Sequence, residues 1–408
     1  MQQNFEKTID FQLLFPKVIN WEHWRKCKPD EPFADKVILF LNALSGSLLK
    51  DKESRLFPDI VTFAFFCRKA NLLTLRNQYL DNTEIRLGRG VVFHVAPSNV
   101  PINFGYSLVA GMLSGNSNIV RVSTKEYPQV NLIIKHIYEV AQNEDQRSVA
   151  DKIALVRYDR HSSATEYFSS ICNVRVIWGG DETIGHIRNN SIPARSFDVT
   201  FADRYSLAAI QADEFEKLDN NQVRDLAEGF YNDTYLFDQN ACSAPHLVIW
   251  FGHVKNIYNS QKRFWEALDI VVKRKYVFQE VLAVDKLIAF YRQAMAMPIK
   301  CEETVDNKLI RVSLTELSSL IDDYRCAGGY FSEYIASSLK EVVPIIKNKY
   351  QTLAYYGFDQ KELQHFVVDN HLIGLDRIVP VGKTTAFSLT WDGYNLITTL
   401  SRVCQIID

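Results

Sequence analysis

Short apolar segments alternate with helical segments between residues 91 and 178, and this alternation constrains the fold more than any other feature of the chain. Strands are expected at 91–95, 118–122, 153–156 and 174–178, and helices at 104–113 and 130–142. Strands that are each followed by a helix predict a parallel sheet with helices on both faces. Sheets of this kind bind nucleotides at the carboxyl ends of their strands.

The remaining regions predict further domains, since 408 residues exceed one small core. Apolar spacing over 37–49 and 56–79 predicts a helical N-terminal region, residues 1–80. The dinucleotide-binding domain is expected at 81–204, together with parts of the terminal segments. A second α/β domain is expected at 205–385, with helices at 261–274 and 281–297. Strands are predicted at 378–381 and 386–389, and residues 386–408 are a candidate oligomerisation segment.

Composition and charge exclude several classes of protein. The formal net charge of −2 and the lack of a basic run argue against nucleic acid and anionic membrane surfaces as partners. The N-terminus has no signal-peptide pattern, and no apolar stretch reaches the roughly 18 residues that span a bilayer. The seven cysteines are scattered without a CxxC pair, so neither disulfides nor a metal site is expected. These features predict a reduced, cytoplasmic enzyme in which six of the cysteines are small buried hydrophobes.

The seventh cysteine, Cys242, lies between Ala241 and Ser243-Ala244. A cysteine that only packs does not need small neighbours, whereas a nucleophilic one needs them so that an acyl carbonyl can reach its sulfur. About 140 residues earlier, Asn99 follows an expected strand and lies between two prolines. Its carboxamide can donate to an oxyanion, or it can serve as an Asx-turn residue.

Two further segments are candidates for binding a cofactor. Gly179-Gly180 follows the fourth expected strand and opens a helix, where a phosphate can approach the backbone; a tight turn is the alternative. Arg121, Ser123 and Lys125 follow the second strand and, if extended, point to one side. Two cations and a hydroxyl can hold a ribose phosphate. The alternative interpretation of this segment is a basic turn whose side chains are solvated.

These segments, in their order along the chain, resemble the aldehyde dehydrogenase superfamily and specifically its LuxC-type acyl-CoA reductase branch. The resemblance covers roughly residues 85–400. It rests on Pro97-Ser98-Asn99-Val100-Pro101, on 115–121, on Trp178-Gly179-Gly180-Asp181, on 196–200, on 238–245 and on Trp391-Asp392-Gly393. It implies an aldehyde-dehydrogenase-like α/β fold, in which a Rossmann-type cofactor domain is joined to an α/β catalytic domain and preceded by a helical N-terminal region.

The resemblance also implies roles for individual residues. Cys242 matches the cysteine that becomes acylated, and Asn99 matches the oxyanion-hole asparagine. Ser98, Arg121, Ser123, Lys125, Gly179 and Gly180 are then the candidate cofactor-binding residues. One departure is informative: the glutamate base of hydrolytic aldehyde dehydrogenases corresponds here to Thr200, within a residue or two.

The resulting hypothesis is the NADPH-dependent reduction of an acyl-CoA or acyl-protein thioester to an aldehyde through an acyl-cysteine, with NADH as the alternative cofactor. His246 and His94 are candidates for activating Cys242, although a structural role is favoured for both. The resemblance implies a homo-oligomer that pairs through exposed strands, and an acyl-protein synthetase or transferase is a candidate partner. The rival hypotheses are a hydrolytic aldehyde dehydrogenase, a reductase of acyl phosphates, and a non-catalytic scaffold that binds an acyl-transferring protein.

Overall fold

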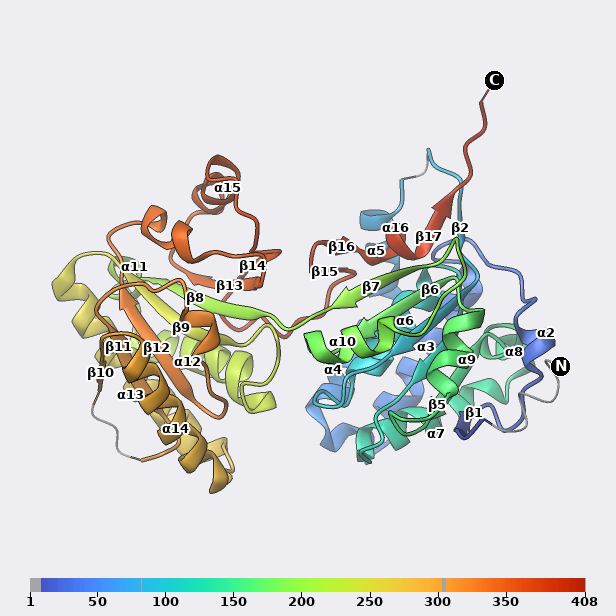
Figure 1. The fold of residues 1–408 in the computed structure, drawn as a ribbon, viewed down its shortest axis with the longest axis horizontal. Coiled ribbons are helices and arrows are strands. Elements are labelled where there is room, and N and C mark those ends of the chain that lie inside the picture. The colour runs from blue at the N-terminus through green and yellow to red at the C-terminus, as the bar shows by residue number, and fades with distance from the viewer. Residues whose placement is uncertain (1–8, 82, 303–305, 408) are drawn as a thin grey trace. The chain divides into compact units, whose positions relative to one another are not determined.

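The computed structural model describes residues 9–81, 83–302 and 306–407, which form two compact units (Figure 1). Unit 1 comprises Met1–Ala202 and Leu389–Asp408, and unit 2 comprises Asp203–Ser388. The main boundary therefore falls within two residues of the one expected between 204 and 205. The N-terminal helices and the C-terminal segment, parts of which were expected to join the dinucleotide-binding domain, both belong to unit 1.

Unit 1 is built on a six-stranded sheet in which one edge strand is antiparallel and the other five strands are parallel. In spatial order the strands are β1 (Gln12–Phe15), β5 (Ile153–Arg157), β4 (Ser117–Arg121), β3 (Val91–Val95), β6 (Val174–Trp178) and β7 (Phe197–Phe201). The order runs outward in both directions from β3, so the chain changes direction between β3 and β6. In open α/β sheets this switch point is where ligands bind.

Helices cover both faces of this sheet because its central strands are apolar on both sides. Phe93 on β3 packs with Phe168 on one face, whereas His94 on the opposite face bonds to Ser107 of α6. The helices of unit 1 are α2 (Trp21–Trp24), α3 (Asp35–Lys50), η2 (Ser54–Leu56), α4 (Pro58–Phe66), α5 (Lys69–Tyr79), α6 (Asn103–Leu113), α7 (Pro128–Ala141), α8 (Glu144–Ala150), α9 (Ala164–Ile171), α10 (Asp181–Arg188) and α16 (Leu396–Leu400).

Two small antiparallel pairs complete unit 1. They are β2 (Arg86–Gly88) with β17 (Ser401–Val403), and β15 (Thr390–Trp391) with β16 (Tyr394–Asn395). The first pair joins the C-terminal segment to the chain just before β3, which explains why that segment belongs to this unit.

Unit 2 contains a seven-stranded sheet that is parallel except for its edge strand β10. In spatial order the strands are β10 (Ile299–Cys301), β11 (Ile310–Leu314), β12 (Tyr330–Ile335), β9 (Pro245–Phe251), β8 (Tyr205–Gln211), β13 (Tyr350–Tyr356) and β14 (Arg377–Pro380). Its helices are α11 (Ala212–Phe215), α12 (Asn220–Thr234), η3 (Tyr235–Phe237), α13 (Val254–Lys275), α14 (Val281–Ala296), η4 (Ile321–Asp323), η5 (Leu339–Ile345) and α15 (Gln360–Asp369). One face packs against α11, α12 and α13 in an aromatic core, and the other packs against α15 and the loops around it.

Three expectations from the sequence need correction. The N-terminal region is not wholly helical, because Gln12–Phe15 pairs with β5 as an edge strand. The long helix expected over 56–79 is interrupted, and Pro58 begins α4 because proline favours the first helical turn. Residues 386–389 are not a strand but part of the connection back to unit 1, in which Ala386 donates its N–H to the Lys383 carbonyl.

Candidate active site

Cys242 lies in a turn between η3 and β9, at the amino-terminal edge of the unit 2 sheet. The Ala244 N–H donates to the Ala241 carbonyl at 2.9 Å, which closes the turn around the cysteine. Ser243 and Ala244 are buried, whereas Cys242 is only partly buried. The small residues that follow therefore pack inward, and Ala241 and Cys242 form the less buried part of the turn.

The backbone before Cys242 is fixed in an unusual conformation. Asp238 and Gln239 have φ values of 51° and 60°, a left-handed conformation that is uncommon for residues other than glycine. The buried Gln239 amide donates to the Pro245 and Tyr330 carbonyls and accepts from the Gly329 and Tyr330 N–H groups. Its four bonds compensate the strain and hold the loop against β12.

The sulfur of Cys242 has a defined polar neighbour. Gln351 of β13 donates from Nε2 to Cys242 Sγ at 3.2 Å. The hydroxyl of Ser206 on β8 donates to the Cys242 carbonyl at 2.7 Å. Both Gln351 and Ser206 are fully buried. Two neighbouring strands therefore hold the cysteine by its backbone and by its sulfur.

Neither candidate histidine supplies a positive charge to Cys242. Burial lowers the pKa of His246 to about 3, helped by the charge of Arg325, and its ring stacks on Tyr205. Burial lowers the pKa of His94 to about 4 despite its bond to Asn118, and its other ring nitrogen contacts Ser107. Both side chains are neutral core groups at physiological pH.

In unit 1 the other candidate residues lie at the carboxyl edge of the sheet. The loop after β3 carries Ser98 and Asn99, which are both exposed, and the Ser98 carbonyl accepts from the Tyr127 hydroxyl at 2.6 Å. Gly179-Gly180 follows β6, the neighbour of β3. The two loops therefore flank the switch point of the sheet, the place where open α/β sheets bind ligands.

Gly180 is not required by the backbone, whereas a Cβ on Gly179 would lie 3.1 Å from the Thr183 side chain. Gly180 caps α10 with φ −67° and ψ 165°, a conformation open to any residue, and a Cβ placed there meets nothing within 4 Å. This leaves room for a ligand at the helix N-terminus. The exposed carboxylates of Asp181 and Glu182 occupy the same first turn, and a bound diphosphate would share the helix dipole with them.

Arg121 is the last residue of β4, and its guanidinium is only partly hydrogen-bonded. It donates from Nη2 to the Tyr158 carbonyl at 3.3 Å and lies over the Tyr158 ring, while its buried Nε has no partner among the described residues. Ser123 and Lys125 follow it, but the extended run ends in a bend where Ser123 Oγ accepts the Lys125 N–H. The exposed Lys125 ammonium lies over Tyr127. The unsatisfied Arg121 donor and the open glycine turn fit a phosphate-bearing cofactor.

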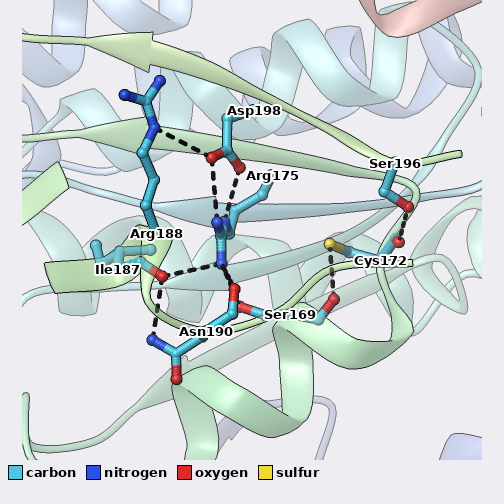
Figure 2. Close-up of polar contacts among 8 residues, drawn as sticks. All are labelled: Ser169, Cys172, Arg175, Ile187, Arg188, Asn190, Ser196 and Asp198. Atoms are coloured by element: carbon cyan, nitrogen blue, oxygen red, sulfur yellow. Dashed lines mark hydrogen bonds and ion pairs between the residues drawn. The ribbon is translucent and has the colours of Figure 1, made fainter. Parts of the chain in front are cut away.

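A buried ion pair holds the other end of α10 (Figure 2). Arg175 of β6 binds both carboxylate oxygens of Asp198 on β7, at 2.8 and 3.1 Å. The same guanidinium donates to Ser169 and to the Ile187 and Asn190 carbonyls at the end of α10. The bonds of Arg175 therefore fix the end of α10 against strands β6 and β7.

The carboxylates flanking Thr200 are both engaged in ion pairs. Asp198 binds Arg175 and Arg188, and Asp203 binds Arg325 and Lys349. Burial raises the pKa of Asp203, but Arg325 and Lys349 lower it by more, so it lies below its ordinary value. Asp203 therefore does not resemble a general base, for which a pKa near the working pH is suited. Asp198 is held between two arginines.

The fold is that of the aldehyde dehydrogenases. A benzaldehyde dehydrogenase from Corynebacterium glutamicum matches with a TM-score of 0.60 and 13% identity, covering 94% of this chain and 86% of that one. A lactaldehyde dehydrogenase from Escherichia coli matches with a TM-score of 0.61 and 10% identity, covering 94% and 87%. At such identities the likeness establishes the architecture.

Within that fold the chain belongs to the acyl-CoA reductase (LuxC) family, whose sequence profile matches residues 75–403. Long-chain acyl-protein thioester reductases from Aliivibrio fischeri and Vibrio harveyi are 22% and 27% identical over 314 and 203 residues. These alignments cover 73% and 48% of this chain. The chain spans 60% of the length of the first relative and 38% of the second.

Some expectations for the site were incomplete. All seven cysteines are free thiols, but of the six expected to be buried only Cys67 and Cys172 are. Cys27 and Cys326 are partly buried, and Cys301 and Cys404 are exposed because they lie on the edge strand β10 and in the C-terminal tail. Sequence reasoning missed Gln351 and Ser206, which no local motif marks. Gln239 lies within the segment quoted around Cys242 and could have been found there. No helix among the described residues is long and apolar enough to cross a membrane.

Proposed function

We propose that this chain reduces an acyl thioester to an aldehyde through an acyl group held on Cys242. The observation that carries the proposal is the Cys242 turn, which is fixed by strained backbone and buried hydrogen bonds while Cys242 itself is only partly buried. Membership of the acyl-CoA reductase family supports the same chemistry. The free thiol that the reaction needs fits the cytoplasmic location expected from the sequence.

In the first step the Cys242 thiolate attacks the thioester carbonyl, and a carbon–sulfur bond forms. The Asn99 carboxamide and the Cys242 N–H stabilise the oxyanion, each by about 3 kcal/mol. The carbonyl re-forms, the bond to the donor thiol breaks, and that thiolate leaves and takes up a proton. The acyl group is then a thioester of Cys242.

The cofactor in this proposal is NADPH, with NADH as the alternative. Arg121, Ser123 and Lys125 would hold its ribose phosphate, and Ser98 and the Gly179-Gly180 turn would face its diphosphate. When bound, the nicotinamide supplies the hydride. The cysteine keeps the carbonyl carbon in place during reduction, and the Cys242–carbon bond then breaks, which releases the aldehyde and restores the thiol after protonation.

The fate of the acyl group favours reduction over hydrolysis. A hydrolytic enzyme needs a carboxylate that takes a proton from water. Thr200 cannot do this, and both neighbouring carboxylates are held by cations. A long-lived acyl-cysteine is therefore expected.

The acyl donor is proposed to be an acyl-CoA or an acyl-protein. The names of the relatives describe reductases of long-chain acyl-protein thioesters. By extension, a protein that synthesises or transfers the acyl group is the proposed partner. A series of acyl-CoA chain lengths identifies the preferred donor.

Acylation of Cys242 is the direct test. The wild-type protein is mixed with radioactive acyl-CoA of several chain lengths, and label on the Cys242 peptide is measured, followed by aldehyde after NADPH is added. Cys242→Ala should abolish both signals. Cys301→Ser is the matched control, because Cys301 is the more exposed thiol, and it should leave both unchanged. Label or aldehyde that survives in Cys242→Ala would disprove the assignment.

Asn99 is tested by the rate of acylation. Asn99→Ala should slow the appearance of label about a hundredfold or more, because one oxyanion donor is lost. An unchanged rate would leave Asn99 as a turn residue. Loss of turnover with every acyl donor in the wild-type protein would instead favour the scaffold hypothesis.

We also propose that the chain forms a homo-oligomer. The family resemblance implies pairing through exposed strands, and the exposed face of α14 is a second surface for pairing. Val281, Val284, Ile288, Tyr291 and Met295 recur at the 3–4 spacing of a helix–helix seam, and each is more than half exposed. A second copy packed antiparallel about Ile288 places Val281 opposite Met295 of the partner subunit. It also brings Asp285 near Arg292 of the partner subunit, a complementary charge pair.

A further inference from the structure

The amino-terminal edge of the unit 2 sheet is irregular where it meets Cys242. Between Tyr350 and Leu353 strand β13 advances three residues, while its neighbour β8 advances two, from Tyr205 to Leu207. On the other side of β8 the pairing with β9 also slips by one residue beside Ser206. Bulges of this kind recur near active sites because they redirect a side chain.

The bulge on β13 changes where Gln351 and Thr352 point. In a regular strand consecutive side chains lie on opposite faces. Here the Thr352 hydroxyl instead donates to Gln351 Oε1 at 3.1 Å, and the Thr352 N–H donates to the hydroxyl of Ser206 at 3.2 Å. The bond to Oε1 fixes the orientation of the amide, so its Nε2 donates to Cys242 Sγ.

The burial of this network makes the donor effective. Gln351, Thr352 and Ser206 are all fully buried, so little water competes for their hydrogen bonds. A hydrogen bond to a charged acceptor is about twice as strong as one to a neutral acceptor. An N–H aimed at sulfur therefore stabilises the thiolate more than the thiol.

The ionisable groups around this edge do not replace that donor. His246 on β9 is neutral, since burial lowers its pKa to about 3. Four cations that precede β8, β12 and β13 are paired with carboxylates: Arg325 and Lys349 with Asp203, Arg204 with Asp376, and Lys347 with Asp322. Arg377, which lies opposite Thr352 on β14, donates to the Thr384 and Ala386 carbonyls, and Lys308 before β11 donates to the Tyr276 carbonyl.

We propose that the Gln351 amide stabilises the Cys242 thiolate through its hydrogen bond to the sulfur. This rests on the proposed function only in making Cys242 the reacting group. The donor acts twice: it favours the nucleophile before acylation, and it favours the same thiolate as leaving group when the aldehyde departs. Thr352 and Ser206 are positioning residues, because they orient the amide and the cysteine backbone without contacting the sulfur in the bonds described.

The test measures the thiol itself and needs neither acyl donor nor cofactor. The rate of Cys242 alkylation by iodoacetamide is followed by mass spectrometry of its peptide between about pH 5.5 and 9.5, a range set around the ordinary thiol pKa. Gln351→Leu should raise the apparent pKa of Cys242 by about one unit, which lowers alkylation at pH 7 about tenfold. Gln351→Glu should raise it further, because a carboxylate repels the thiolate.

Two variants keep the test independent of folding. Gln293→Leu removes another fully buried glutamine of unit 2 and should leave the alkylation profile unchanged. Thr352→Val removes the orienting hydroxyl and should shift the profile in the same direction by a smaller amount, about two- to threefold in rate. Folding of each variant is checked by circular dichroism.

A wild-type profile retained in folded Gln351→Leu and Thr352→Val overturns the proposal. A shifted profile in a protein that forms no acyl-cysteine would disprove the proposed function but leave this assignment standing.

Discussion

Arg175 is predicted to be the most sensitive stability determinant around α10. Its side chain is 2% exposed and makes five hydrogen bonds, two of them to Asp198, which is 13% exposed. Arg175→Met removes the guanidinium but keeps most of the packing volume. It leaves a largely buried carboxylate whose remaining cation is Arg188, 3.4 Å away.

The expected loss of stability follows from the burial of the Arg175–Asp198 ion pair. Breaking a buried ion pair by removing one partner costs about 3–5 kcal/mol, because the other charge stays desolvated. Arg188 contacts the same carboxylate, but it is 55% exposed and screened by water. Arg188→Ala should therefore lower the stability of unit 1 by at most about 1 kcal/mol, the range measured for exposed ion pairs. The double variant Arg175→Met/Asp198→Leu should recover much of the loss, since no buried charge remains.

Hydrogen exchange read by mass spectrometry is the suitable assay, since a chain with two units has no single free energy of unfolding. Peptides covering β6 and α10 should exchange about 10²–10³-fold faster in Arg175→Met, whereas peptides from β9 in unit 2 should be unchanged. Equal effects of Arg175→Met and Arg188→Ala would refute the reasoning, and so would a double variant as unstable as the single one.

Three further predictions concern the cofactor turn, the buried histidine and the α14 face. Gly180→Ala should leave the fold intact, because its Cβ meets nothing within 4 Å, but should weaken NADPH binding about tenfold. Gly185→Ala, equally open, is the control in a fluorescence titration, and equal affinities would contradict the site. His94 has a pKa near 4 when folded and near 6.5 when unfolded, so the unfolded state binds the extra proton. Stability of unit 1 should therefore fall as pH drops from 6.5 to 4, by at most about 1.4 kcal/mol per pH unit, and His94→Gln should flatten that slope in hydrogen exchange. Ile288→Asp should dissociate an oligomer in analytical ultracentrifugation, whereas Tyr258→Asp on the exposed face of α13 should not.

The fold of unit 1 was predictable because its signal is local. Strands 91–95 and 174–178 were placed at their observed bounds, since each is an apolar run that ends at a turn signal. Strand β1 escaped detection because four residues carry little periodicity and gain their conformation by pairing with β5. The connection at 386–389 was mistaken for a strand for the same reason, as its short apolar run has no partner strand in the described structure.

The candidate site likewise contains some residues that the local sequence reveals and others that it does not. Cys242 and Asn99 were visible because each lies in a short distinctive segment, and family likeness added their order. Gln351 could not be found in the sequence, because its contact with the sulfur depends on a bulge that appears only when β13 is paired with β8. Gln351 and Cys242 are 109 positions apart, and no sequence motif contains both. A sequence motif thus identifies a candidate nucleophile, whereas the groups that contact it come from strands that tertiary pairing brings alongside.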